Sequence, residues 1–286
     1  MQVRLEVVAI NSSANPGFGS GLTNIAKHWF LIFIFIKSRA AVTGGRNSNA
    51  TPAQSPIVVR HLQTDLMEIE LIPVIEIVYN NQKRNLPAFP YWEHSEIWDT
   101  FNQENLLEAG FTDKLTPFLS GSSFYRLADI SNKNLSKLTI DQTTDLQNGK
   151  YTREEAIGIY GGYVLRIDGQ DIFFPQCCGE LSDITYWTRL SIEHDSFCEG
   201  HPRPEVKFKN GIITLDFTVD KYDEPFQPPV LETTLKIERK SLGKAIEKVK
   251  LELEIFGQRL LNINIDKKLN IPNIDKMLIW NNPNYE

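Results

Sequence analysis

The residues best suited to chemistry lie together in one window, residues 177–201. This window holds all three cysteines and two of the five histidines of the chain. Cys177 and Cys178 are adjacent, and His194, Cys198 and His201 follow at intervals of four and three residues. Zn²⁺ favours thiolate and imidazole ligands, and short ligand pairs joined by a longer loop are typical of its sites. The window is therefore a candidate zinc site, of a kind that could belong to a hydrolase.

Two other interpretations of the same window need no metal. Cysteine is among the most often buried residues, and successive side chains diverge, so adjacent cysteines rarely bind one ion. The absence of any Cys-x-x-Cys pair favours free thiols in a core, beside exposed histidines. The third interpretation is a thiol nucleophile, in which Cys198 takes His194 or His201 as its base and Asp183 or Asp195 orients that base.

Acidic residues surround the cysteines and suggest a surface for a partner. We expect an acidic patch, with Trp187 as its aromatic anchor, to bind a basic protein, since complementary charge speeds association and aromatic side chains act as hot spots. A neutraliser of a basic toxin or nuclease would be one example. The alternative places Trp187 with Tyr186 and Leu190 on the buried face of a helix over residues 182–190. The candidate patch consists of Glu180, Asp183, Trp187, Glu193, Asp195 and Glu199.

Composition narrows the class of function. The 36 acidic residues outnumber the 30 basic ones, giving a net charge of −6, which argues against a nucleic-acid binder with a broad basic face. Three cysteines cannot form a disulfide scaffold, and an odd number suits a reducing compartment such as the cytoplasm. Among the classes that remain, we favour a soluble, non-enzymatic protein-binding module, with zinc binding as the alternative.

The elements that must position these side chains indicate an α+β fold over residues 67–286. Asp168-Gly169 and Asn210-Gly211 carry the preferred chemistry of type I′ turns, so each predicts a β-hairpin of an antiparallel sheet. Residues 68–79 alternate as a half-buried strand, and Pro73 assigns that strand to a sheet edge.

Helices are expected to cover this sheet. Apolar residues recur at three- and four-residue steps over 242–261, which predicts a long C-terminal amphipathic helix. A helix over 95–108 would be capped by Ser95 and stopped by Gly110, and the capping box formed by Thr152 and Glu155 predicts a short helix over 153–158. The polar stretch 131–149 is expected to be a surface loop.

Residues 1–66 differ from the rest of the chain in composition. They carry more basic than acidic residues and include the eight-residue apolar run 29–36, which is too short to span a membrane as a helix. Gly17, Gly19 and Gly21 do not have the spacing of a dinucleotide-binding turn. Since Met67 opens a clean strand pattern, we expect residues 1–66 to be a leader outside the natural folded unit, or a mis-assigned start.

Overall fold

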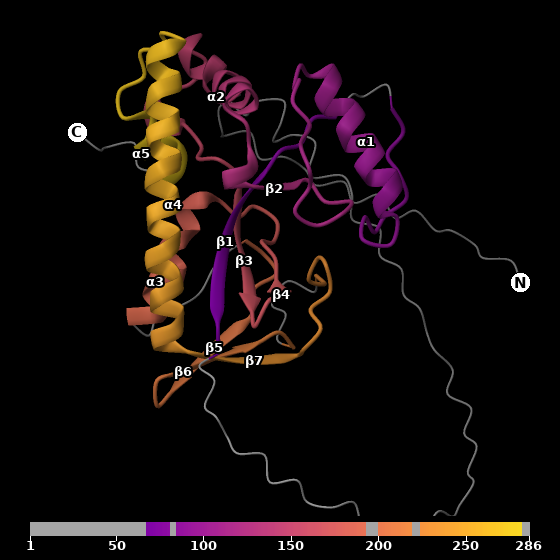
Figure 1. Cartoon of the computed structure of the whole chain (residues 1–286), viewed down its shortest axis with the longest axis vertical. Coiled ribbons are helices and arrows are strands. Elements are labelled where there is room, and N and C mark those ends of the chain that lie inside the picture. Colours follow the sequence, from indigo (N-terminus) through magenta and orange to yellow (C-terminus); the bar gives the residue numbers. More distant parts are fainter. Residues whose placement is uncertain (1–66, 81–83, 193–199, 219–223, 282–286) are drawn as a thin grey trace, which may run out of the picture. The chain divides into compact units, whose positions relative to one another are not determined.

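The computed structural model describes residues 67–80, 84–192, 200–218 and 224–281. All of them belong to one compact unit, residues 58–286, and the predictions for residues 1–66 lie outside the described part. Helices and antiparallel sheets are mixed in this unit, which confirms the α+β class (Figure 1). Among the described residues, no helix is long and apolar enough to cross a membrane.

The larger sheet has four strands in the order β2-β1-β3-β4. They are β1 (Ile69–Glu76), β2 (Phe124–Arg126), β3 (Gly161–Ile167) and β4 (Gln170–Phe173), and every neighbouring pair is antiparallel. The edge position predicted from Pro73 is wrong, because β1 lies between β2 and β3. Successive backbone N–H groups alternate sides along a strand, and Ile77 donates to Ser123 on the β2 side. The nitrogen of Pro73 faces that same side, where β2 pairs only with Val74 to Glu76, so the proline interrupts no pairing.

A smaller sheet of three strands contains β5 (Glu205–Lys209), β6 (Ile212–Asp216) and β7 (Thr234–Glu238), in that order. Both predicted hairpins are confirmed, because β3 turns into β4 at Asp168-Gly169 and β5 turns into β6 at Asn210-Gly211. The four turn residues have φ values between 49° and 78°, the positive range that a type I′ turn requires.

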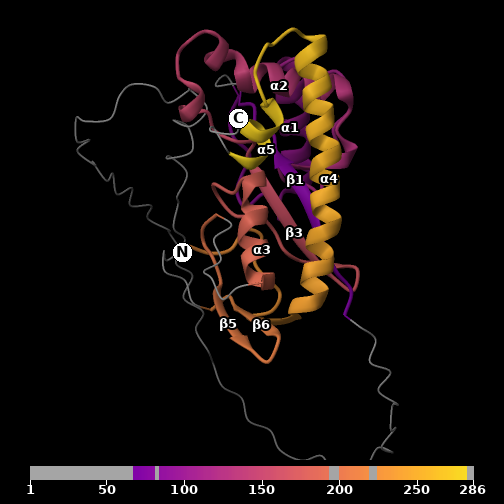
Figure 2. The same ribbon diagram turned by 90° about the vertical axis from the view of Figure 1, so that its left-hand side faces the viewer.

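In the described part of the chain, five α-helices accompany the sheets: α1 (Ser95–Glu108), α2 (Asn132–Gln147), α3 (Ile184–Ile192), α4 (Arg239–Asp266) and α5 (Ile274–Trp280). The predicted amphipathic helix is confirmed as α4, which lies along β1 with α3 and α5 beside it (Figures 1 and 2). Its apolar stripe is buried throughout, from Leu242 to Leu260. Helix α1 has the expected bounds, but Ser95 is its first residue and the N-cap position is taken by His94, whose side chain makes no capping hydrogen bond. The predicted helix over 153–158 is a 3₁₀ turn, Arg153–Glu155, with its capping box present.

The surface loop expected over 131–149 is wrong, because this stretch forms α2. Ser131 caps it by accepting a hydrogen bond from the backbone N–H of Asn134 at 3.2 Å. Leu135, Leu138, Thr139 and Thr143 lie on one buried face of the helix. Two of these four are threonines, so the stripe is too polar to stand out in the sequence, although its spacing is helical.

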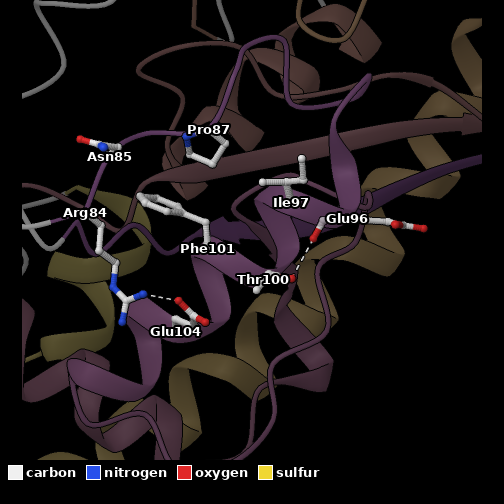
Figure 3. A pocket seen from close by; sticks show the side chains of 8 residues that line it. All are labelled: Arg84, Asn85, Pro87, Glu96, Ile97, Thr100, Phe101 and Glu104. Atoms are coloured by element: carbon white, nitrogen blue, oxygen red, sulfur yellow. Dashed lines mark hydrogen bonds and ion pairs between the residues drawn. The ribbon is translucent and has the colours of Figure 1, made fainter.

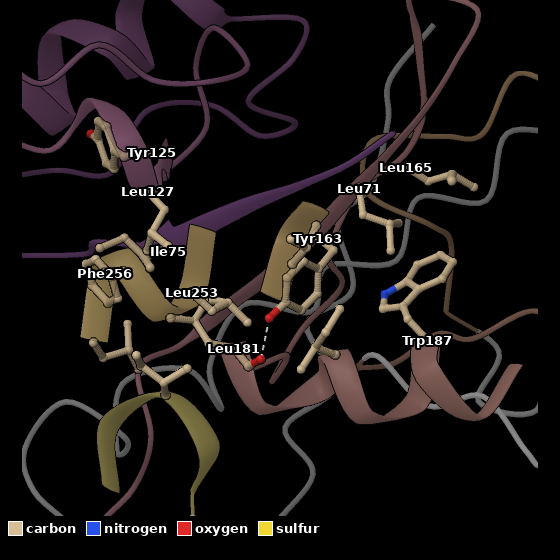
Figure 4. Close-up of a cluster of buried hydrophobic side chains, with 14 of the residues drawn as sticks. Leu71, Ile75, Tyr125, Leu127, Tyr163, Leu165, Leu181, Trp187, Leu253 and Phe256 are labelled. Atoms are coloured by element: carbon tan, nitrogen blue, oxygen red, sulfur yellow. Dashed lines mark hydrogen bonds between the residues drawn. The ribbon is translucent and has the colours of Figure 1, made fainter. Parts of the chain in front are cut away.

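One hydrophobic core joins both sheets to α4. It contains Leu215 of β6 in a single cluster with Ile75 of β1, Leu165 of β3 and Leu253 of α4. Figure 4 shows the last three of these side chains. Trp187 on α3 is fully buried in this cluster, as the helical interpretation of 182–190 predicts. Tyr163 anchors the segment just before α3, because its buried hydroxyl donates to the carbonyl of Leu181.

Candidate functional site

The candidate site is built where the chain returns from β4 toward β3. Tyr160, just before β3, forms an isolated antiparallel bridge with Glu180, which holds residues 176–180 against the start of that strand. A second bridge joins Cys177 to His201, whose backbone N–H donates to the Cys177 carbonyl at 3.1 Å. Backbone pairing thus brings two residues 24 positions apart into contact.

Gly200 makes this second bridge possible. Its φ is +72°, and a Cβ at this position would lie 2.5 Å from the Cys177 carbonyl oxygen and 2.7 Å from that of Gln176. Only glycine fits so close an approach with a left-handed backbone. The residue before His201 is therefore fixed by the geometry of the site.

The two adjacent thiols converge. The Cys177 Sγ lies 3.2 Å from the Cys178 Sγ, so the divergence expected of successive side chains is absent here. The backbone supplies the reason, since Cys178 has a φ of +67°, outside the extended conformation in which neighbouring side chains point apart. Cys178 is exposed and Cys177 is half-buried, so the free-thiol core predicted from the sequence is wrong for Cys178.

His201 completes a three-residue cluster. One ligand atom from each of Cys177, Cys178 and His201 lies within 4.8 Å of the other two. The Nδ1 of His201 is 2.8 Å from the Oε2 of Glu224, which fixes the orientation of the ring. The arrangement therefore presents two sulfurs and an imidazole backed by a carboxylate.

The thiols are electrostatically distinct. The pKa of Cys178 falls to about 6, first because the Cys177 thiol donates a hydrogen bond to it and then because His201 lies beside it. The same hydrogen bond and burial raise the pKa of Cys177. Burial lowers the pKa of His201, but its hydrogen bonds to Glu224 and Cys178 outweigh this and raise it. At neutral pH these directions describe a Cys178 thiolate held between a thiol donor and an imidazole.

A second carboxylate, that of Glu76, interacts electrostatically with Cys178. Burial raises the pKa of Glu76, at the end of β1, to about 7, and the nearby Cys178 adds to the rise. The hydroxyl of Ser123 opposes it by donating to Glu76 Oε1 at 2.9 Å. Sequence reasoning missed both Glu76 and Glu224. No signal marks them, because Glu76 is one member of an alternating strand and Glu224 follows His201 by 23 residues without a motif.

The predicted partner-binding residues that the structure describes serve the protein's own packing. Trp187 belongs to the core. The Oδ2 of Asp183 accepts from the backbone N–H of Glu180 at 2.9 Å, while Glu180 itself is half-buried and accepts from Ser182 and Asn281 at 3.1 Å each. The remaining predicted site residues lie outside the described part of the chain, namely Glu193, His194, Asp195, Cys198 and Glu199.

A surface hollow elsewhere on the molecule offers less chemistry. It lies between α1 and the segment that leads into it, and it is lined by Arg84, Asn85, Pro87, Glu96, Ile97, Thr100, Phe101 and Glu104 (Figure 3). Its one basic side chain, Arg84, already pairs with Glu104 and Glu108. With no thiol or imidazole in its lining, this hollow is a weaker candidate than the cysteine cluster.

Comparison with known proteins gives no further guide to this site. No protein-family model matches the sequence, and searches of curated proteins and of solved structures find no match.

Proposed function

We propose that the protein binds one thiophilic metal ion through Cys177, Cys178 and His201, and that this ion is Zn²⁺. The observation that carries the proposal is the convergence of two sulfurs and an imidazole nitrogen within 4.8 Å. These are the donor types that zinc selects, and three residues from two separate segments meet at one point.

The surroundings of His201 support this ligand set. Histidines that bind metals usually donate their second ring N–H to a carboxylate, which fixes the tautomer and the ring orientation. The contact between His201 Nδ1 and Glu224 at 2.8 Å has this form. It leaves Nε2 as the nitrogen for the ion.

The spacing of the sulfurs fits a site that opens slightly when it is loaded. Two thiolates on one tetrahedral zinc lie about 3.8 Å apart, given Zn–S bonds of about 2.3 Å. The sulfurs of Cys177 and Cys178 are 3.2 Å apart, so loading would separate them by roughly 0.6 Å. Three protein ligands also leave one position for water or a substrate, which is the position that a hydrolytic zinc site would use.

The proposal implies a location where both thiols stay reduced, such as the cytoplasm. A basic protein partner, inferred from charge alone, stays a prediction. Trp187 is not available to anchor it, because its side chain is fully buried.

Cobalt titration of the reduced full-length chain tests the proposal. Co²⁺ takes the same ligands as Zn²⁺, and its sulfur-to-cobalt absorption reports thiolate coordination directly. We expect this band to saturate at one ion per chain and to collapse in Cys178→Ser and in His201→Ala. His94→Ala, a substitution at a histidine next to α1, serves as the matched control and should leave the titration unchanged.

The titration can contradict the assignment clearly. If Cys178→Ser and Cys177→Ser both bind Co²⁺ with the wild-type spectrum, the two residues are not ligands. Cys198→Ser answers a separate question, since a partial loss of the band would add Cys198 to the ligand set as the sequence predicts.

A further inference from the structure

Cys177 and Cys178 form an unusual pair of thiols, being adjacent in the chain and also adjacent in space. Their sulfurs are 3.2 Å apart and share a hydrogen bond. Cys178 is exposed, whereas Cys177 is half-buried. A reagent from solution therefore reaches Cys178 first, with a second thiol already in position next to it.

We propose that Cys177 and Cys178 form a reversible vicinal disulfide, which switches the metal site off. The disulfide is an inference from the sulfur positions alone, whereas its switching role rests on the proposed metal binding. Oxidation would remove two of the three ligands at once and leave His201 without thiolate partners.

The geometry makes this disulfide accessible and also easy to reduce. A disulfide bond is about 2.0 Å long, so the sulfurs must approach by roughly 1.2 Å. Adjacent Cα atoms are about 3.8 Å apart across a trans peptide bond, below the range of about 4.4 to 6.8 Å that disulfides usually span. The ring that a disulfide between adjacent cysteines closes is therefore strained, and strained, exposed disulfides are easily reduced.

The oxidant we infer is a small-molecule disulfide, such as glutathione disulfide. The Cys178 thiolate attacks one of its sulfurs and forms a mixed disulfide, while one glutathione thiolate leaves. Cys177 then loses its proton and attacks the Sγ of Cys178, which expels the second glutathione thiolate. The two protein sulfurs together lose two electrons, and one glutathione disulfide is reduced to two glutathione molecules, whose released thiolates take up the proton of Cys177 and one proton from solvent.

The chain has protease sites that isolate the two cysteines for mass spectrometry. Trypsin cuts after Arg166 and after Arg189, so the peptide 167–189 contains Cys177 and Cys178 but not Cys198. The full-length chain is reduced, freed of metal with a chelator, treated with glutathione disulfide, alkylated and digested. We expect peptide 167–189 to be lighter by two hydrogens, to resist alkylation and to recover both free thiols in dithiothreitol. Two glutathione adducts on this peptide, or a cross-link to the peptide with Cys198, would overturn the proposal.

Single substitutions separate the two steps. Cys177→Ser should trap one glutathione on Cys178, because the resolving thiol is missing. Cys198→Ser is the matched control and should oxidise like the wild type. Loss of oxidation in Cys198→Ser would show that the disulfide joins other residues and would overturn the inference.

Repeating the oxidation with Zn²⁺ bound distinguishes this inference from the proposed function. If both hold, saturating Zn²⁺ slows disulfide formation at least tenfold. Disulfide formation that zinc does not affect would overturn the switching role and the metal site while supporting the disulfide. Zinc binding without any disulfide would overturn this inference and leave the proposed function standing.

Discussion

At the scale of single residues, backbone conformation explains the candidate site better than residue type does. From the sequence, Cys177, Cys178 and His201 are candidate metal ligands because of their side-chain chemistry. The sequence does not reveal that Cys178 has a φ of +67°, which turns its sulfur toward that of Cys177. Glu224 could not be predicted at all, because it reaches His201 from a segment 23 residues farther along the chain. The sequence gives the type of each residue, whereas the tertiary fold determines which of these side chains come into contact.

Gly200 is the residue whose replacement should disturb this geometry most directly. In Gly200→Ala the new Cβ would meet the Cys177 carbonyl at 2.5 Å on a left-handed backbone, so we expect a loss of about 1–3 kcal/mol in unfolding free energy. Gly243→Ala, in the interior of α4 with open space around its Cβ position, should instead stabilise the protein by about 0.5–1 kcal/mol. Urea unfolding of both variants measures the contrast. Equal effects of the two substitutions would contradict the close approach at Gly200.

Asp183 should make the unfolding free energy of the protein depend on pH, in a direction that follows from its pKa. Burial, first of all, raises its pKa to about 7 in the folded protein, against an ordinary value of 3.8. Between about pH 4 and 7 the unfolded chain loses this proton before the folded one does, so the unfolding free energy falls as pH rises through that window. From pH 5.5 to 7.5 the fall due to Asp183 should be about 1–2 kcal/mol, at about 1.4 kcal/mol per unit of pKa difference.

The variant Asp183→Asn removes this contribution while keeping an oxygen to accept the N–H of Glu180. Urea unfolding of the wild type and the variant at both pH values measures the difference. If the variant loses as much stability as the wild type between pH 5.5 and 7.5, Asp183 does not titrate in this range.

At the scale of secondary structure, elements with strong local signals could be predicted and those defined by tertiary packing could not. The turns at Asp168-Gly169 and Asn210-Gly211, and the stripe of α4, follow from backbone preference and periodicity within one segment. Helix α2 cannot be predicted because the threonines on its buried face make its hydrophobic stripe too polar to recognise. The place of β1 in the sheet cannot be predicted either, because the sequence does not show that β2 pairs only with Val74 to Glu76 and stops before Pro73.

Helix α4 allows a direct test of its packed face. Leu253 is fully buried in the core, whereas Leu251, two positions earlier, is 61% exposed. Leu253→Ala should lower the unfolding free energy by about 2–5 kcal/mol because it leaves a cavity, while Leu251→Ala should change it by less than about 0.5 kcal/mol. Thermal or urea unfolding of the pair measures both effects. A similar loss in the two variants would contradict the assigned orientation of the helix.

At the scale of the whole molecule, one continuous core unites the two sheets. Leu235 and Ile237 of β7 belong to the same cluster as Ile75 and Leu253, so the buried residues of the smaller sheet share their core with the larger sheet and α4. We expect the two sheets to unfold together. Far-ultraviolet circular dichroism and tryptophan fluorescence should then give coincident urea transitions, and Leu235→Ala should shift both midpoints equally. Two separated transitions would show that the smaller sheet is an independent unit.

The proposed metal site would give the folded unit a function. The most direct measurement is the zinc content of the reduced full-length protein after exposure to Zn²⁺ and exhaustive dialysis, compared with the Cys177→Ser/Cys178→Ser double variant. We predict about one zinc per chain in the wild type and almost none in the folded double variant. A wild-type protein without zinc, or a double variant that keeps its zinc, would contradict the assignment of Cys177, Cys178 and His201 as the metal site.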